Sequence, residues 1–338
     1  MSQPNTTHSP GLFTSLQLRG VTVKNRVVVS PMCQYASVNG APTDWHLAQL
    51  GRYALGGAGI VFGEETAVEA RGRKTYQCAG LWCDEQIEHY RRLTTFIRAH
   101  GAIPAMQIGH SGRKASVHGA TRDWVPLTTE NAEPDCPPWQ GIAPSAVPVS
   151  SAHHCPREMD REDMQTVIDA FVATSHRAEA AGYDILEIHG AHGYLLHQFL
   201  SPVTNQRNDQ YGGTLKNRMR YPIEVAKAVR SAWPDDKPLF YRLSAVDGQG
   251  GAWSLDDSVV LSAELKAVGV DVIDCSSGGI SGSSNMALVK RVPGYQVSFA
   301  ERIRAECGIQ TMAVGLITQA QQADKIIRSE QALSLIHI

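Results

Sequence analysis

Long hydrophobic runs are missing from this sequence. No apolar stretch approaches the ~20 residues needed to span a bilayer, and residues 1–10 are polar, without the apolar core of a secretory signal peptide. The 7 cysteines are odd in number and include no Cys-x-x-Cys pair, which argues against a disulfide framework. We therefore expect a cytoplasmic protein with reduced thiols and no membrane partner.

An excess of either charge is also missing. Lys and Arg number 31 and Asp and Glu number 33, so the net charge is −2 and the sequence carries no electrostatic footprint for nucleic acid or acidic membranes. Hydrophobic residues make up 43% of the chain and charged residues 19%, which is typical of a soluble globule with a large core. The composition favours a small-molecule partner and excludes nucleic acid as an expected one.

No dinucleotide fingerprint follows the first predicted strand, because the glycine-rich residues 56–59 precede a strand instead of opening a helix. This absence argues against an open doubly wound sheet. Strand and helix patterns nevertheless alternate along the chain, which implies right-handed βαβ units and a parallel sheet. The sequence therefore predicts one α/β domain over residues 1–338, a (β/α)8 TIM barrel. The predicted strands are 26–30, 59–63, 103–108, 185–188, 239–243, 272–273 and 310–314, with the apolar tail 333–338 as a candidate eighth.

The two ends of the chain carry further expectations. Residues 10–23 alternate in polarity around Arg19 and Gly20 and predict a hairpin that could plug the bottom of the barrel. A typical barrel has ~30 residues per βα unit, so most of the last unit is absent here. We expect a barrel truncated at or within strand eight, without its final helix and with an unpaired edge that costs stability.

Two long insertions, 110–157 and 194–216, follow predicted strands and lack clear periodicity. They fall on the face where barrel enzymes place their chemistry, and loops of this length usually serve as lids or binding segments.

Polar residues stand at nearly every predicted strand end. The carboxyl ends of parallel barrel strands share one mouth, so these side chains should converge on a site. His192 and Tyr194 follow the His189 strand end within five residues. Small-residue turns at 278–279 and 314–316 offer backbone amides of the kind that bind phosphate, which favours a phosphate-bearing cofactor. The strand ends carry Cys33, Glu64, Glu65, Gln107, His189, Arg242, Cys275, Ser276 and Gly315.

Several motifs, in the right order over about residues 12–331, resemble the old yellow enzyme family. The cysteine after Ser-Pro-Met points to a bacterial subclass that carries a thiol there. The resemblance implies an FMN-containing (β/α)8 barrel that oxidises NADPH or NADH and reduces the C=C bond of α,β-unsaturated carbonyl compounds. The motifs are Ser30-Pro-Met-Cys-Gln-Tyr35, Gln107-Ile-Gly-His-Ser-Gly-Arg-Lys114, His189-Gly-Ala-His-Gly-Tyr194, Ser201-Pro202, Asn205, Arg207, Asp209-Gln-Tyr-Gly-Gly213, Asn217-Arg218 and Tyr241-Arg-Leu-Ser244.

The resemblance also implies roles for the polar cluster. His189 and His192 would donate two N–H bonds to the substrate's carbonyl oxygen, where negative charge develops during hydride delivery. Tyr194 would act as the general acid that protonates the α-carbon. Without the resemblance, each histidine is more often a satisfied core residue, and a metal pair lacks acidic or thiolate ligands in obvious spacing.

Cofactor contacts are implied in the same way. Arg242 would lie beside the flavin N1 and O2 atoms, where a permanent cation stabilises the anionic reduced flavin. Gln107 would pair with the pyrimidine edge, and Cys33 would tune the redox behaviour of the flavin, although a free cysteine is otherwise a small buried hydrophobe. The remaining implied contacts are the backbone of Ser30, Pro31 and Met32 along the isoalloxazine, Gly315 at the phosphate, Tyr35 at the substrate and Lys114 as positive charge near cofactor or lid.

Two departures from the family pattern stand out. Glu65 occupies a position where relatives carry a small residue, and an anion pointed at the flavin would oppose its reduction, so we expect a backbone contact alone. The Gly-Arg pair with which relatives grip the FMN phosphate lies beyond strand eight and has no counterpart here. These departures keep open a non-catalytic, flavin-poor remnant, and they weaken the expectation of a homo-oligomer. A metal-dependent barrel hydrolase is a more distant alternative.

Overall fold

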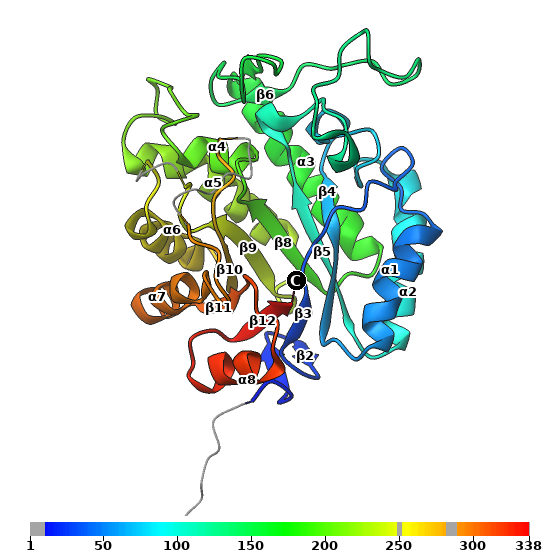
Figure 1. Ribbon diagram of the computed structural model, residues 1–338, viewed down its shortest axis with the longest axis vertical. Coiled ribbons are helices and arrows are strands. Elements are labelled where there is room, and N and C mark those ends of the chain that lie inside the picture. Colours follow the sequence, from blue (N-terminus) through cyan, green and yellow to red (C-terminus); the bar gives the residue numbers. More distant parts are fainter. Residues whose placement is uncertain (1–10, 249–251, 282–288, 338) are drawn as a thin grey trace, which may run out of the picture.

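In the computed structural model, which describes residues 11–248, 252–281 and 289–337, parallel strands form a closed barrel surrounded by helices (Figure 1). The strand order is β10-β11-β12-β3-β4-β5-β8-β9, and β9 pairs with β10 to complete the ring. The barrel strands are β3 Val27–Val29, β4 Ile60–Ala67, β5 Ile103–Gly109, β8 Ile185–Gly190, β9 Leu239–Ser244, β10 Val272–Ser276, β11 Gln310–Ala313 and β12 Ser334–His337.

Helices alternate with the barrel strands as the sequence pattern predicts, whereas α4 lies in the second insertion, where no helix was expected. Polar side chains cap several of them: Asp160 accepts a hydrogen bond from the backbone N–H of Asp163, and Ser254 does the same for Asp257. The helices are α1 Asp44–Leu55, α2 Ile87–Ala99, α3 Arg161–Ala180, α4 Leu195–Leu200, α5 Leu215–Ala232, α6 Leu255–Ala267, α7 Val297–Cys307 and α8 Ala320–Arg328. Among the residues described, no helix is both long enough and apolar enough to cross a membrane.

The expected unpaired edge at strand eight is wrong. The apolar tail forms β12, which pairs in parallel with β11 on one side and with β3 on the other. Closure therefore satisfies the backbone groups that an open edge would leave exposed.

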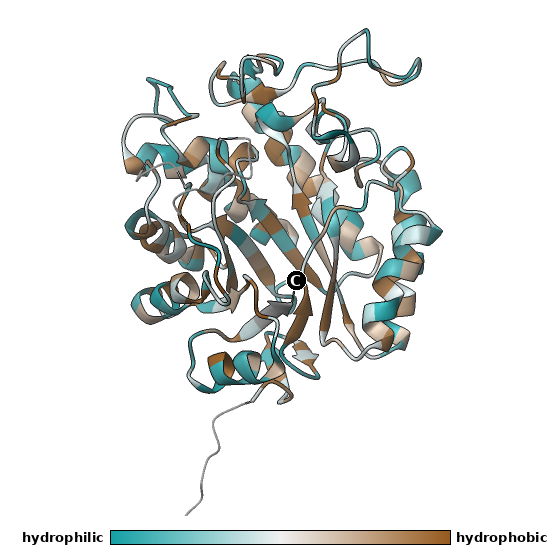
Figure 2. Cartoon of the chain, viewed as in Figure 1, coloured by the Kyte–Doolittle hydropathy of each residue, from teal (hydrophilic) through white to brown (hydrophobic). Residues whose placement is uncertain are grey.

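The barrel strands alternate between two hydrophobic environments. One set of side chains, exemplified by Leu186 and Leu243, belongs to the large core between strands and helices. The other set, exemplified by Ile185 and Phe240, forms a second cluster inside the barrel. Figure 2 shows the corresponding brown strands inside a shell of helices with teal outer surfaces. Because successive residues of a strand point to opposite faces, one sequence period supplies both cores.

The hairpin of β1 Leu16–Leu18 and β2 Val21–Val23 forms where the alternating pattern predicts it. Its side chains Leu16, Leu18 and Val23 belong to the same buried cluster as the inward-facing residues of the barrel strands.

Inside the barrel, polar residues stand two or four positions after the apolar inward-facing ones. Gln107 follows Ala105, Glu187 and His189 follow Ile185, Arg242 follows Phe240, and Asp274 follows Val272. The interior is therefore apolar near the hairpin and polar toward the carboxyl ends of the strands, where barrel enzymes carry their sites.

The first insertion has structure that the sequence did not predict. It contains two short strands, β6 Ile142–Ala143 and β7 Arg157–Glu158, which pair in parallel. It also includes the turns η3 Gly112–Lys114 and η4 Ala120–Arg122.

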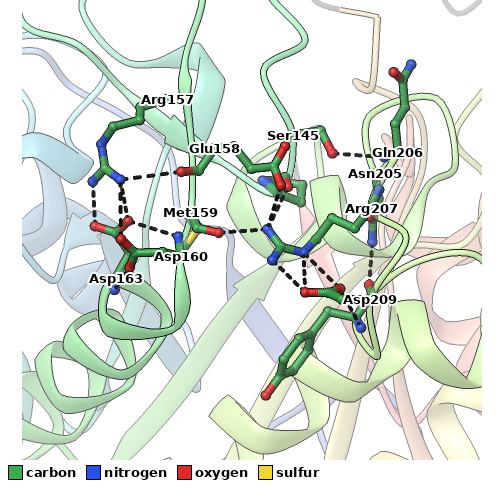
Figure 3. Close-up of polar contacts among 12 residues, drawn as sticks. Ser145, Arg157, Glu158, Met159, Asp160, Asp163, Asn205, Gln206, Arg207 and Asp209 are labelled. Atoms are coloured by element: carbon green, nitrogen blue, oxygen red, sulfur yellow. Dashed lines mark hydrogen bonds and ion pairs between the residues drawn. The ribbon is translucent and has the colours of Figure 1, made fainter.

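Arg207 joins this small sheet to the second insertion (Figure 3). Its guanidinium donates to both carboxylate oxygens of Asp209, with Nη2 2.6 Å from Oδ2, and to the carbonyl oxygens of Pro144 at 3.0 Å and Met159 at 2.7 Å. The side chain is only 8% exposed. This motif residue is therefore part of a clamp that fixes the base of the first insertion to the second insertion.

We expect Arg207→Lys to lower the free energy of unfolding by about 1–3 kcal/mol, because an ammonium cannot reproduce the guanidinium fork and leaves buried carbonyls without a donor. Urea denaturation measures the loss, and limited proteolysis within 144–159 should become faster. Arg157→Lys is the matched control, since Arg157 also binds a carboxylate but is 45% exposed, and should change stability by less than about 1 kcal/mol. Equal losses in the two variants would refute the clamp.

Candidate active site

A layer of four buried polar side chains crosses the barrel interior: Gln107, Glu187, Arg242 and Asp274. Gln107 Nε2 donates to Glu187 Oε1 at 2.8 Å, Arg242 Nε lies 3.0 Å from Asp274 Oδ2, and Arg242 Nη1 donates to Ser30 Oγ at 3.3 Å. Burial raises the pKa of both Glu187 and Asp274, and repulsion from Asp274 raises that of Glu187 further, while Arg242 opposes the shift. One cation thus serves two carboxyl groups, which favours a protonated Glu187.

The histidine pair lies at the end of β8, directly above this layer. The rings of His189 and His192 are 5.1 Å apart, and the ring of His189 is also 5.1 Å from that of Tyr194. His192 adopts a left-handed backbone with φ of +58°, and its backbone N–H donates to Ser244 Oγ at 2.9 Å. Strained backbone of this kind is frequent at functional sites.

Both imidazoles are neutral at pH 7. Burial lowers the pKa of His189 and His192 well below its usual value, and the nearby cation of Arg242 adds to the effect. His189 Nδ1 accepts from the backbone N–H of Ala191 at 3.4 Å, which leaves its proton on Nε2. His192 Nε2 lies 2.6 Å from Ser276 Oγ. Each ring is therefore a neutral imidazole with one N–H, which in His189 lies on Nε2.

Tyr194 caps α4 and lies between two lysines. The Nζ atoms of Lys74 and Lys114 lie 4.9 Å and 5.3 Å from its ring centroid. Burial raises the pKa of the Tyr194 phenol, so the hydroxyl is protonated, although Lys74 acts in the opposite direction. The arrangement presents a protonated phenol whose conjugate phenolate has cations beside it.

The segment after β3 is fixed by a buried carboxylate. Glu64 accepts from His46 Nε2 at 2.8 Å and from the backbone N–H of Gln34 at 3.0 Å, while Gln34 Nε2 donates to the carbonyl of Met32 at 2.7 Å. The segment that holds Ser30, Pro31 and Met32 is therefore positioned from both β4 and α1.

Cys33 and Tyr35 lie on this same segment. Burial raises the pKa of the Cys33 thiol to about 12, so it is a neutral thiol despite the influence of Lys74. Tyr35 has a φ of +52°, and its ring stands edge-on to Trp124 at 5.4 Å. It also lines a cavity of about 190 Å³ beneath the first insertion. Tyr35 thus lies at the boundary between mouth and insertion.

Gly315 forms the turn after β11. Its φ is +120°, and a Cβ there would lie 2.8 Å from Tyr295 Cε1, so both the backbone and the space require glycine. The neighbouring Gln296 accepts from Ser277 Oγ at 2.6 Å and donates to the Val314 carbonyl at 3.2 Å.

The structure thus gathers most predicted site residues at one mouth, and it adds others. The sequence analysis did not identify Glu187 and Asp274 as site residues. Each stands two residues before a predicted strand-end residue, His189 or Ser276, and therefore faces the same side of its strand. Lys74 lies in a loop, where no sequence periodicity predicts the position of its side chain. The side chain of Glu65 lies inside the mouth and pairs with Lys74.

Lys114 is half-buried, and among the residues that the structure describes it has no acidic partner. Its Nζ donates to the carbonyl oxygens of His192, at 2.7 Å, and Gly279. Burial, together with Arg113 and Lys74, lowers the pKa of Lys114 from 10.5 to about 7. Unlike a fixed cation, this lysine can lose its charge near neutral pH.

The lowered pKa predicts a pH-dependent stability. Between pH 7 and 10.5 the unfolded chain binds the Lys114 proton more tightly, so the cost of this lysine is full below pH 7 and falls as pH rises. Relative to Lys114→Met, the FMN-free wild type should gain up to about 1.4 kcal/mol per pH unit across that window, measured by urea denaturation. Lys216→Met, at an exposed position, is the control. Parallel profiles for wild type and Lys114→Met would contradict the assignment.

Comparison with known proteins identifies the family of this chain. The model of the NADH:flavin oxidoreductase / NADH oxidase family matches residues 11–338. The NADPH dehydrogenase of Geobacillus sp. strain WCH70 is 42% identical over 323 residues, which cover 95% of this chain and 87% of that protein. The NADPH dehydrogenase of Listeria monocytogenes serotype 4a is 41% identical over 95% of this chain and 88% of the relative.

Solved structures share the fold. Morphinone reductase superposes with a TM-score of 0.80 at 24% identity, over 98% of this chain and 86% of that one. The old yellow enzyme homologue from Zymomonas mobilis gives a TM-score of 0.79 at 20% identity, over 97% and 88% of the two chains. With a family model matched over nearly its whole length, the chain belongs to the NADH:flavin oxidoreductase / NADH oxidase family, that of the old yellow enzymes, and is a flavin-dependent oxidoreductase with FMN and NAD(P)H as cofactors.

Proposed function

We propose that this enzyme is an ene-reductase that reduces the C=C bond of α,β-unsaturated carbonyl compounds with electrons from NADPH or NADH. The observation that carries the proposal is the cluster of two neutral imidazoles and one protonated phenol, with rings 5.1 Å apart, at the mouth of the barrel. In such substrates the carbonyl oxygen and the α-carbon, which needs a proton, are two bonds apart. The cluster contains candidate donors for both atoms.

The residues at the mouth suit a flavin. Arg242 is buried, yet among the described residues its Nη2 has no hydrogen-bond partner, so it can face an electron-rich edge. Gln107 can donate and accept, and Gly315 forms the turn after β11 with a φ of +120°. Residues expected to hold FMN are Ser30, Pro31, Met32, Cys33, Glu65, Gln107, Arg242 and Gly315. When bound, FMN supplies the hydride.

The protein's own residues would then handle charge and protons. His189 and His192 would hold the carbonyl oxygen of the substrate, and as buried neutral donors they stabilise the negative charge that develops there. Tyr194 would give its proton to the α-carbon, and the cations of Lys74 and Lys114 would favour the phenolate left behind. Tyr35 would contact the substrate from the insertion side.

We further propose that the chain works as one FMN-binding domain and that the β1–β2 hairpin closes the floor of the barrel. Support comes from Leu16, Leu18 and Val23, which share a buried cluster with the inward-facing strand residues. A closed floor keeps water away from the polar layer from below.

The histidine pair is tested by separating the two half-reactions. We expect His189→Ala and His192→Ala each to slow reoxidation of the reduced enzyme by cyclohexenone about 10²–10³-fold, because an oxyanion donor is lost. Reduction of bound FMN by NADPH should fall less than about tenfold, and anaerobic stopped-flow absorbance follows both steps.

His100→Ala, which changes a histidine on the outside at the end of α2, is the control and should leave both steps unchanged. A wild-type chain that stays colourless after FMN reconstitution overturns the proposal and favours the flavin-poor remnant. Equal losses in both half-reactions would reassign the pair to nicotinamide positioning.

The acid role of Tyr194 has a separate test. Tyr194→Phe keeps the ring but removes the proton, so we expect alkene reduction to slow by about 10²–10⁴-fold for substrates whose α-carbon solvent does not readily protonate. The NADPH half-reaction should keep its rate. Tyr53→Phe, on the outer helix α1, serves as the control. An unchanged rate of product formation in Tyr194→Phe would remove Tyr194 from this role.

A further inference from the structure

A buried ion pair lies within the mouth, and the proposed mechanism gives its two residues no role as a pair. Lys74 Nζ contacts Glu65 Oε2, and the two residues are only 2% and 4% exposed. Glu65 stands on β4, whereas Lys74 lies in the loop after η1 Ala70–Gly72. Two charged groups from different elements are thus brought together in a place that water barely reaches.

A β-bulge aims Glu65 into the barrel. Phe62 pairs with Ala105 and Glu65 with Gln107, so β4 has one extra residue across this interval. Without the bulge, alternation would turn Glu64 inward. With it, Glu64 remains available for His46, and Glu65 takes the inward position beside Gln107.

The carboxylate lies directly beside the histidine cluster. A Cβ added at Gly109 would lie 2.7 Å from Glu65 Oε1 and 3.1 Å from His189 Cβ, so glycine leaves the space that this carboxylate fills. On the other side, Lys74 Nζ lies 4.9 Å from the ring centroid of Tyr194. The pair therefore spans the gap between two residues of the proposed chemistry.

Stability does not account for such a pair. Replacing a buried ion pair by apolar groups of similar volume is often neutral or stabilising, whereas removing one partner leaves an uncompensated buried charge. The pair is better explained by the electrostatic effect of its charges on a group bound at the mouth. The other mouth cation, Arg242, has its own partner in Asp274, so Lys74 is the compensating charge for Glu65.

Resting on the function proposed above, we infer that Lys74 is a positioning residue that neutralises Glu65 and so sets the electrostatic field in which the flavin is reduced. Reduction adds negative charge to the flavin, which an unpaired Glu65 opposes and an unpaired Lys74 favours. The pair as a whole is neutral. This explains how an acidic residue is tolerated at a position where an isolated anion would hinder the reaction.

The inference predicts shifts of opposite sign in the reduction potential of bound FMN. At a fixed potential, Lys74→Met should lower the ratio of reduced to oxidised flavin at least tenfold, which is about 30 mV for a two-electron couple. Glu65→Gln should raise that ratio by a similar factor. The double variant should return to within about threefold of wild type, and so should Lys74→Arg, which keeps the charge.

Dye-coupled equilibrium titration of the holoenzyme measures these potentials. In Lys74→Met the shift should grow as pH rises, because a carboxyl group left unpaired in a buried place takes up a proton at lower pH. Lys227→Met and Glu179→Gln change exposed residues of the helices α5 and α3 and should leave the potential at the wild-type value. In the FMN-free protein, thermal unfolding should show the double variant to be more stable than either single one.

The outcomes separate the two proposals. Wild-type protein that binds no FMN overturns the proposed function, and this inference with it. Holoenzyme whose single variants shift the potential in the same direction, or leave it unchanged, overturns the inference alone. If Lys74→Met fails to fold, Lys74→Arg, Glu65→Gln and the double variant still decide the question, since only an electrostatic role predicts a rise in Glu65→Gln and its reversal in the double variant.

Discussion

The structure depends on closure of the parallel barrel. Once β9 pairs with β10 and β12 with β3, every strand has two neighbours, and the inside and outside faces of each strand are fixed by the two-residue period. Among the inward-facing positions, apolar side chains lie near the hairpin and polar side chains lie toward the carboxyl ends of the strands. The candidate site is therefore the upper part of the same interior packing whose lower part stabilises the fold.

Strand-end residues were predictable because parallel topology converts separate sequence positions into one mouth. His189, Gln107 and Arg242 were found this way, and Glu187 could have been found by following the same period inward. Lys74 could not, because its position depends on a loop that only tertiary packing fixes. The pairing of β12 was missed for a related reason: four residues have too little pattern of their own, and closure supplies their partners.

Buried charge is organised in compensated groups. Arg242 lies between Ser30 and Asp274, Glu65 binds Lys74, and Lys114 is held by backbone carbonyl oxygens alone. In a low-dielectric interior an unmatched charge is expensive, so such groups persist only where each has a partner or can lose its charge. Lys114 is the exception, because it can lose its proton near pH 7, whereas Arg242 keeps its charge.

The two insertions contribute Lys114 and Tyr194 to the site, whereas the other charged mouth residues come from the strands and from the loop of Lys74. Arg207 fixes the base of the first insertion to the second through a carboxylate and two carbonyl oxygens. The rings of Tyr35 and Trp124 meet edge to face, and Tyr35 also lines a cavity of about 190 Å³. Changes in the upper loop can thus alter which substrate fits while the field at the barrel mouth stays the same.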